Sequence, residues 1–133
     1  MGKVKKGWLR DGLAVYYQRL PELETIEIKD SNPEKEGTQI LSMLKSSDRL
    51  IALSEEGKTF SSLKLANFLA KANSNSLVFI IGGATGLSQA LKQSATQLLS
   101  LSPMTFPHEI ARLLLVEQLY RAKTILQGSQ YHK

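Results

Sequence analysis

The sequence contains no cysteine and only two histidines, His108 and His132. Without cysteine the chain forms neither a disulfide nor a thiolate nucleophile, and most zinc sites are excluded. Two histidines are too few for an all-histidine metal site. The apolar runs are far shorter than the roughly 20 residues of a membrane-spanning helix, and no signal-peptide core precedes them. We therefore expect a cytoplasmic protein with no membrane span and no metal.

The length of the chain and its net charge indicate the number of domains and the kind of partner. With 133 residues, the chain is expected to form a single domain spanning residues 1–133. Seventeen lysines and arginines against twelve acidic residues give a net charge of +5. This balance agrees with a polyanionic partner such as RNA, and equally with a solvated basic surface.

Hydrophobic periodicity predicts alternating strands and helices. That order indicates an α/β fold with a mainly parallel sheet. Asn32-Pro33 predicts a helix start, and Ser61 or Ser62 and Ser88 are candidate helix caps. The expected strands are 25–29, 49–54, 77–81 and 98–101, and the expected helices are 8–20, 33–44, 62–72, 88–95 and 109–126.

The stretch 77–86, with sequence LVFIIGGATG, organises the rest of the chain. Its unbroken apolar run predicts a central strand that is buried on both faces. Three glycines follow within five residues, and Ser88 then opens a helix. A strand, a glycine loop and a helix start commonly form a small-molecule site, although a simple tight turn explains the spacing as well.

Two nucleotide-binding motifs are only partly present. Gly57-Lys58-Thr59 resembles the end of a phosphate-binding loop, but Ala52 stands at its first glycine position. Glu55 and Glu56 would repel phosphate there, so nucleotide binding is the weakest interpretation. The glycine loop also lacks a dinucleotide fingerprint, because Ile81 occupies a required glycine position.

The C-terminal third contains further candidates. A loop bracketed by two prolines, 102–108, precedes the longest predicted helix, whose apolar residues cover more than one face and suggest a partner helix. His108 and Arg112 are four residues apart and share a face of that helix, whereas Glu117 and Arg121 suit an ordinary ion pair. The tail, Tyr131-His132-Lys133, is expected to be disordered.

Several strings together resemble a known family: FIIGGATGLS, LSLSPMTFPH, RLLLVEQLYRA, the ending YHK, and Gly2-Lys3 with its basic run. The chain is similar to the SPOUT superfamily of RNA methyltransferases. Within it, the chain looks like the small family that methylates ring position 3 of a pseudouridine in large-subunit ribosomal RNA. The resemblance implies a C-terminal trefoil knot, a homodimer formed through the C-terminal helix, and S-adenosyl-L-methionine as cofactor.

The resemblance also implies where the functional residues lie. His108 or His132 would assist proton removal, Arg112 would contact the RNA, and the tail would extend to the partner subunit. The catalytic candidates are thus His108, Arg112, Tyr131 and His132. Three segments would hold the cofactor, namely Leu53, the glycine loop (Gly82, Gly83 and Gly86) and the proline-bracketed loop (Leu101, Ser102, Pro103, Met104, Thr105 and Phe106).

One departure from the family pattern affects this expectation. Members normally begin with a short apolar strand before the Gly-Lys that stands here at Gly2-Lys3, and Met1 takes its place. The sequence therefore predicts a sheet without its first strand, and a start codon placed too late would explain this. The alternative to an enzyme is a non-catalytic module of the same fold that binds RNA or the ribosome.

Overall fold

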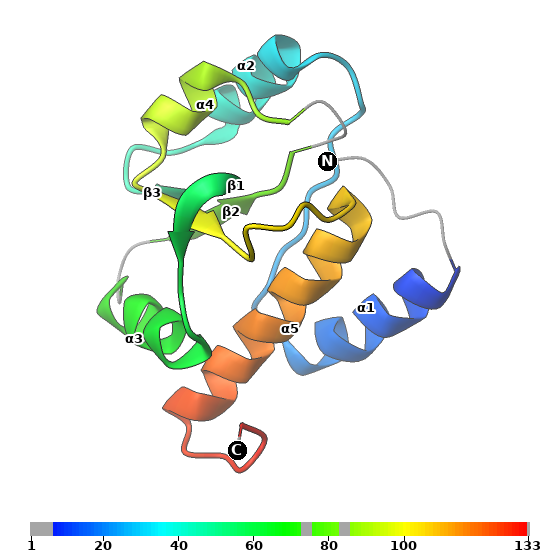
Figure 1. Ribbon diagram of the computed structural model, residues 1–133, viewed down its shortest axis with the longest axis vertical. Helices are drawn as coiled ribbons and strands as arrows, with labels where there is room; N and C mark the ends of the chain where they lie inside the picture. Colours follow the sequence, from blue (N-terminus) through cyan, green and yellow to red (C-terminus); the bar gives the residue numbers. More distant parts are fainter. Residues whose placement is uncertain (1–6, 73–75, 83–85, 133) are drawn as a thin grey trace.

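The computed structural model describes residues 7–72, 76–82 and 86–132 of the chain. Helices and strands alternate along it, so the predicted α/β class is confirmed (Figure 1). The basic run near the N-terminus and Gly83 lie outside the described residues. The elements are α1 (Gly7–Arg19), α2 (Pro33–Met43), β1 (Arg49–Thr59), α3 (Ser62–Ala72), β2 (Leu77–Ile80), α4 (Gln89–Ser94), β3 (Gln97–Ser100) and α5 (His108–Leu126).

The sheet of the described chain has three parallel strands in the order β2-β1-β3. β1 is therefore its middle strand, pairing Leu50 with Val78 of β2 and Ala52 with Leu98 of β3. The prediction that the strand at 77–81 is central was wrong, because β2 lies at an edge of this sheet and is mostly only partly buried. An apolar run indicates that the faces of a strand are covered, but it does not indicate which strands pair with its edges.

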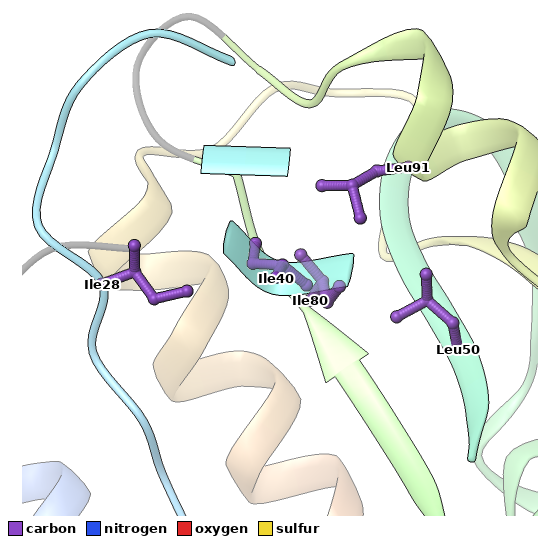
Figure 2. Close-up of a cluster of buried hydrophobic side chains, with 5 residues drawn as sticks. All are labelled: Ile28, Ile40, Leu50, Ile80 and Leu91. Atoms are coloured by element: carbon purple, nitrogen blue, oxygen red, sulfur yellow. The ribbon is translucent and has the colours of Figure 1, made fainter. Parts of the chain in front are cut away.

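Helices cover both faces of the sheet (Figure 1). Successive side chains of β1 point to opposite faces. Leu50 packs with Ile40 of α2 and Leu91 of α4, in a cluster that also contains Ile28 and Ile80 (Figure 2). Ile51 packs on the other face with Leu65 of α3 and Leu99 of β3. Burial on both sides explains the unbroken apolar sequence at the start of β1.

Residues 25–29, predicted to be a strand, pair with no strand of the described chain. Ile28 is buried in the cluster of Figure 2, but Ile26 is 57% exposed. In a half-buried strand both side chains would lie on the same face. The alternation in the sequence was therefore misleading, and Ile28 anchors an irregular segment in the hydrophobic core.

The long helix α5 packs against both α1 and α3. Leu9 and Leu13 of α1 are buried against Val116 of α5. On the other side, the hydroxyl of Ser62 in α3 donates to Oε1 of Gln118 at 2.6 Å. Much of the second apolar face of α5 is thus covered within the chain, although Leu114 and Leu126 remain 37% and 50% exposed. A homodimer through α5 stays a prediction.

The caps predicted for α2, α3 and α4 are present. Asn32 accepts a hydrogen bond from the backbone N–H of Lys35 at 2.8 Å, and Pro33 occupies the first turn of α2. Ser88 accepts from the N–H of Leu91 at 3.2 Å, and Ser61 accepts from Lys64. Within the described ranges, no helix has both the length and the hydrophobicity to cross a membrane.

Candidate active site

A cavity of about 680 Å³ opens where the parallel strands end and α5 begins. Its walls come from the segment after Leu53, from the loop after β2, from the loop after β3 and from the first turn of α5. Parallel sheets commonly place ligand sites at this edge. The structure brings most of the predicted cofactor residues together here, namely Leu53, Gly82, Gly86, Leu101, Ser102, Met104, Thr105 and Phe106.

Two of the predicted cofactor residues do not belong to this described lining. Pro103 is exposed and does not line the cavity, while Gly83 lies outside the described residues. Met104 lines the cavity but is 75% exposed, so it lies at the rim rather than in the interior.

The loop between β3 and α5 is held by its own hydrogen bonds. The buried hydroxyl of Ser100 donates to the carbonyl of Ser102 at 2.9 Å. The hydroxyl of Ser102 in turn accepts from the N–H of Met104 at 3.0 Å. Pro103 and Pro107 fix their own φ angles, which further limits the loop. The cavity therefore has a backbone wall that is ordered before any ligand binds.

Gly82 and Gly86, the described ends of the glycine loop, lie close together and line the cavity. A Cβ atom at Gly82 would lie 2.9 Å from the carbonyl carbon of Gly86, closer than real Cβ contacts allow. Gly86 has a φ of +83°, a conformation that side-chain-bearing residues rarely adopt. Both glycines are therefore required by the backbone path, which also brings main-chain groups to the cavity wall.

β1 continues to Thr59, beyond the end predicted for this strand at residue 54. Its ladder with β3 is interrupted between Leu53 and Lys58, both of which pair with Leu99. A Cβ at Gly57 would lie 2.5 Å from the carbonyl carbon of Leu98, so only glycine permits this close approach. Lys58 and Thr59 then rejoin the ladder. Because they form part of a strand, the structure excludes a phosphate-binding loop at 57–59.

Charged side chains that the sequence did not single out for the site also line the cavity. They are Glu55 and Glu56 from β1 and Lys92 from α4. Nζ of Lys92 lies 3.0 Å from Oε1 of Glu56. The ion pair joins residues 36 positions apart, so no local pattern reveals it.

His108 and Arg112 are placed differently, although they are one turn apart on α5. His108 lines the cavity. Nε of Arg112 donates to the hydroxyl of Tyr17 at 2.9 Å and its Nη1 pairs with Glu27 at 2.8 Å. Burial alone would lower the pKa of Arg112, but the hydrogen bonds to Glu27 and Tyr17 raise it above its ordinary value. Arg112 thus joins α5 to α1 and to the irregular segment.

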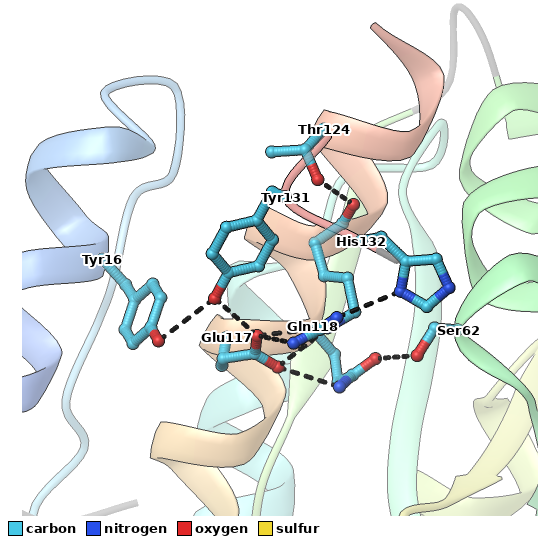
Figure 3. A network of polar contacts seen from close by, with 8 residues as sticks. Tyr16, Ser62, Glu117, Gln118, Thr124, Tyr131 and His132 are labelled. Atoms are coloured by element: carbon cyan, nitrogen blue, oxygen red, sulfur yellow. Dashed lines mark hydrogen bonds and ion pairs between the residues drawn. The ribbon is translucent and has the colours of Figure 1, made fainter. Parts of the chain in front are cut away.

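The C-terminal tail, expected to be disordered, is folded against α5 up to His132 (Figure 3). The hydroxyl of Tyr131 donates to Oε2 of Glu117 at 2.9 Å, and the predicted ion pair of Glu117 with Arg121 is present at 2.8 Å. Nη1 of Arg121 lies 3.0 Å from Nδ1 of His132. Because arginine can only donate, Nδ1 is the acceptor and Nε2 carries the proton, which leaves this docked ring without a free basic nitrogen.

The tail and the cavity lie apart in one chain. Glu117, which holds Tyr131, is nine residues beyond His108 on α5. At 1.5 Å per residue this separation is about 14 Å along the helix axis. The structure therefore does not bring the four catalytic candidates together within a single chain.

A family model described as predicted SPOUT methyltransferase matches residues 1–132. The chain belongs to the SPOUT methyltransferase family. The structure adds the parallel sheet with flanking helices to this assignment, while the trefoil knot stays a prediction.

Relatives of this SPOUT methyltransferase are similar to it over its whole length. A protein of Prochlorococcus marinus (strain MIT 9303) is 55% identical over all of this chain and 89% of its own length. Proteins of Synechococcus sp. (strain RCC307) and Synechococcus sp. (strain CC9605) are 54% and 52% identical, with 90% and 92% of their own lengths covered. Each of the three is named ribosomal RNA large subunit methyltransferase H.

Proposed function

We propose that this protein transfers a methyl group from S-adenosyl-L-methionine to large-subunit ribosomal RNA, at ring position 3 of a pseudouridine. The family assignment and the name of its relatives support this reaction. We further propose that the single domain acts in the cytoplasm on the assembled ribosome. The observation that carries the proposal is the cavity formed by the interrupted part of β1 after Leu53, by the loops that follow β2 and β3, and by the start of α5.

The cavity fits the proposed cofactor in size and chemistry. Ligand sites of this kind have volumes of roughly 300–1,000 Å³, and this one has about 680 Å³. Leu53, Leu101 and Phe106 offer apolar surface to an adenine ring, and the ordered loop between β3 and α5 offers main-chain groups to its polar edge. Once bound, the cofactor supplies an electrophilic methyl group on a sulfonium.

His108 is the residue of this chain that suits a role in proton transfer. It lines the cavity, and the attacking ring nitrogen of a pseudouridine must lose its proton when the new N–CH3 bond forms. A neutral imidazole can accept that proton directly or through water. The chain otherwise contributes mainly by orienting the two reactants.

The other catalytic candidates require a second copy of the chain. Tyr131 and His132 are about 14 Å or more from His108 along α5, so they would serve the cavity of a partner. The exposed Leu114 and Leu126 on α5 support a symmetric contact between copies. In such a homodimer, the tail of one protomer would extend to the cavity of the other.

We propose that Arg112 contacts the RNA and that the net charge of +5 attracts the RNA to the protein. Arg112 is a cation at every relevant pH, as arginines are, and its pairing with Glu27 and Tyr17 raises its pKa further. Its side chain is only 18% exposed. A direct RNA contact would therefore require Arg112 to exchange part of this pairing for a phosphate.

Calorimetric titration with S-adenosyl-L-methionine tests cofactor binding, with ATP and magnesium as the control ligand. Transfer of a labelled methyl group to ribosomes, to isolated large subunits and to naked ribosomal RNA then tests the reaction. Nucleoside analysis of the product identifies the methylated position. Cofactor binding with no transfer to any of these substrates would favour the non-catalytic RNA-binding module.

A further inference from the structure

Lys92 and Glu56 form an ion pair on the wall of the cavity. Nζ of Lys92 lies 3.0 Å from Oε1 of Glu56, and both residues line the cavity together with Glu55. The Lys92 side chain is only 18% exposed, whereas that of Glu56 is 67% exposed. Among the described lining residues, Lys92 is the only lysine or arginine.

Folding stability does not account for this placement. An ion pair with one partner so exposed contributes little to stability, because water screens the attraction and both side chains lose freedom. Glu56 remains well solvated if Lys92 leaves it, and Lys92 needs an anion because it is mostly buried. Lys92 can therefore exchange Glu56 for an anionic group of a ligand, and Glu56 can exchange Lys92 for a cationic group.

The ligand proposed for this cavity has the charges that such an exchange requires. Its adenosine part suits the apolar and main-chain wall that Leu53, Leu101 and Phe106 provide. Its amino-acid end carries one carboxylate and one ammonium group. Resting on the proposed function, we infer that Lys92 binds the carboxylate and Glu56 binds the ammonium of that amino-acid end. These are positioning and specificity residues, since neither charge reacts.

Ligands that lack the amino-acid end provide the test. Calorimetry should compare S-adenosyl-L-methionine with 5′-methylthioadenosine, which keeps the adenosine and the sulfur. Lys92→Met should weaken binding of the first ligand about 10-fold and leave binding of the second unchanged. Lys92→Arg should restore most of the affinity. Lys71→Met removes a lysine from the exposed end of α3, outside the cavity lining, and serves as the matched control for net charge.

The two roles are separated by decarboxylated S-adenosylmethionine, which keeps the ammonium but lacks the carboxylate. Lys92→Met should bind this ligand as the unmodified protein does, whereas Glu56→Gln should still bind it about 10-fold more weakly. Glu56→Gln, like Lys92→Met, should leave the affinity for 5′-methylthioadenosine unchanged. Circular dichroism and thermal melts should confirm that each variant is folded.

Each outcome bears on the inference. Equal effects of Lys92→Met on all three ligands, or no effect on any, overturn the inference while the proposed function stands. If the unmodified protein binds none of the ligands, the proposed function fails and the inference fails with it. Selective loss of affinity for the ligands that carry the corresponding charge is the expected result.

Discussion

The hydroxyl of Tyr131 donates to Oε2 of Glu117 at 2.9 Å, and this bond docks the C-terminal tail on the middle of α5 (Figure 3). The hydroxyls of Tyr131 and Tyr16 also lie 3.3 Å apart, a contact in which either hydroxyl can donate. The rings of Tyr131 and Tyr120 also meet edge to face, with centroids 4.8 Å apart. The tail is therefore held by polar and aromatic contacts to two helices.

We expect Tyr131→Phe to loosen the tail without unfolding the domain. The variant keeps the ring contact with Tyr120 but removes a hydrogen bond to a carboxylate, so docking of the tail should weaken by about 1 kcal/mol. Hydrogen exchange of the backbone amides near Tyr131 measures this change. Tyr120→Phe is the matched control, because no hydrogen bond from its hydroxyl to a described residue is found. Unchanged exchange in Tyr131→Phe would contradict the expected role of the hydroxyl.

Because of the Tyr131 hydroxyl, we also expect the folding stability of the protein to fall at alkaline pH. The hydrogen bond with Tyr16 raises the pKa of Tyr131 above its ordinary value, and burial and Glu117 raise it further. The stabilisation is therefore complete below the unfolded pKa of about 10 and is lost as pH rises through the higher folded pKa. Urea unfolding between pH 8 and pH 11 should show the difference between the unmodified protein and Tyr131→Phe shrinking above pH 10. A constant difference would contradict this sign.

Local sequence rules predicted the elements that depend on local chemistry. Asn32-Pro33 and Ser88 mark helix starts because the cap and the helix are neighbours in sequence. The loops that line the cavity were also found, because loops after parallel strands meet at one sheet edge. Periodicity failed at Ile26, where a strand-like alternation found no partner strand among the described residues.

The features of the site and the fold that the sequence did not predict depend on contacts between residues far apart in the chain. Lys92 meets Glu56 across 36 positions, and Tyr131 meets Tyr16 across 115. The need for glycine at position 57 comes from the backbone of Leu98, which belongs to a different strand. Such contacts become visible only once the topology is known, because a single sequence does not state which strands become neighbours.

Gly57→Ala should destabilise the protein by about 1–3 kcal/mol, because the added Cβ would lie 2.5 Å from the backbone of Leu98. A flexible side chain could move aside, but the β3 backbone is fixed by its ladder with β1. Thermal or urea unfolding measures the loss. Gly7→Ala is the control, since a Cβ there meets nothing within 4 Å. Equal stability of the two variants would show that β1 and β3 separate without cost.

Arg112→Met should lower folding stability by about 1–2 kcal/mol, because it breaks the bonds to Tyr17 and Glu27 that join α5 to its neighbours. A double-mutant cycle with Glu27→Gln measures how much of this loss belongs to the ion pair. If Arg112 also contacts RNA, Arg112→Met alone should reduce the salt dependence of ribosome binding by about one phosphate contact. An unchanged salt dependence would limit Arg112 to its structural role.

His108→Ala and His132→Ala should each lower methyl transfer about 100-fold or more, with little change in cofactor affinity, if each assists the reaction. Single-turnover rates on ribosomes and calorimetry separate the two effects. If His132→Ala leaves the rate of methyl transfer unchanged, the tail has no role in the mechanism. This outcome would agree with the docked ring of His132, whose Nδ1 already accepts from Arg121.

Mixing the two histidine variants tests whether the tail serves a partner. In a homodimer whose tails cross over, each mixed dimer has one cavity with an intact His108 and an intact His132 from the other protomer. Random exchange of subunits should then restore roughly a quarter of the unmodified activity. If each tail serves its own chain, every cavity in the mixture lacks one histidine and no activity returns. Light scattering must confirm that the protein is a dimer, and an affinity tag on one variant must co-purify the other to confirm that subunits exchange. Failure to recover activity then rules out the crossed arrangement.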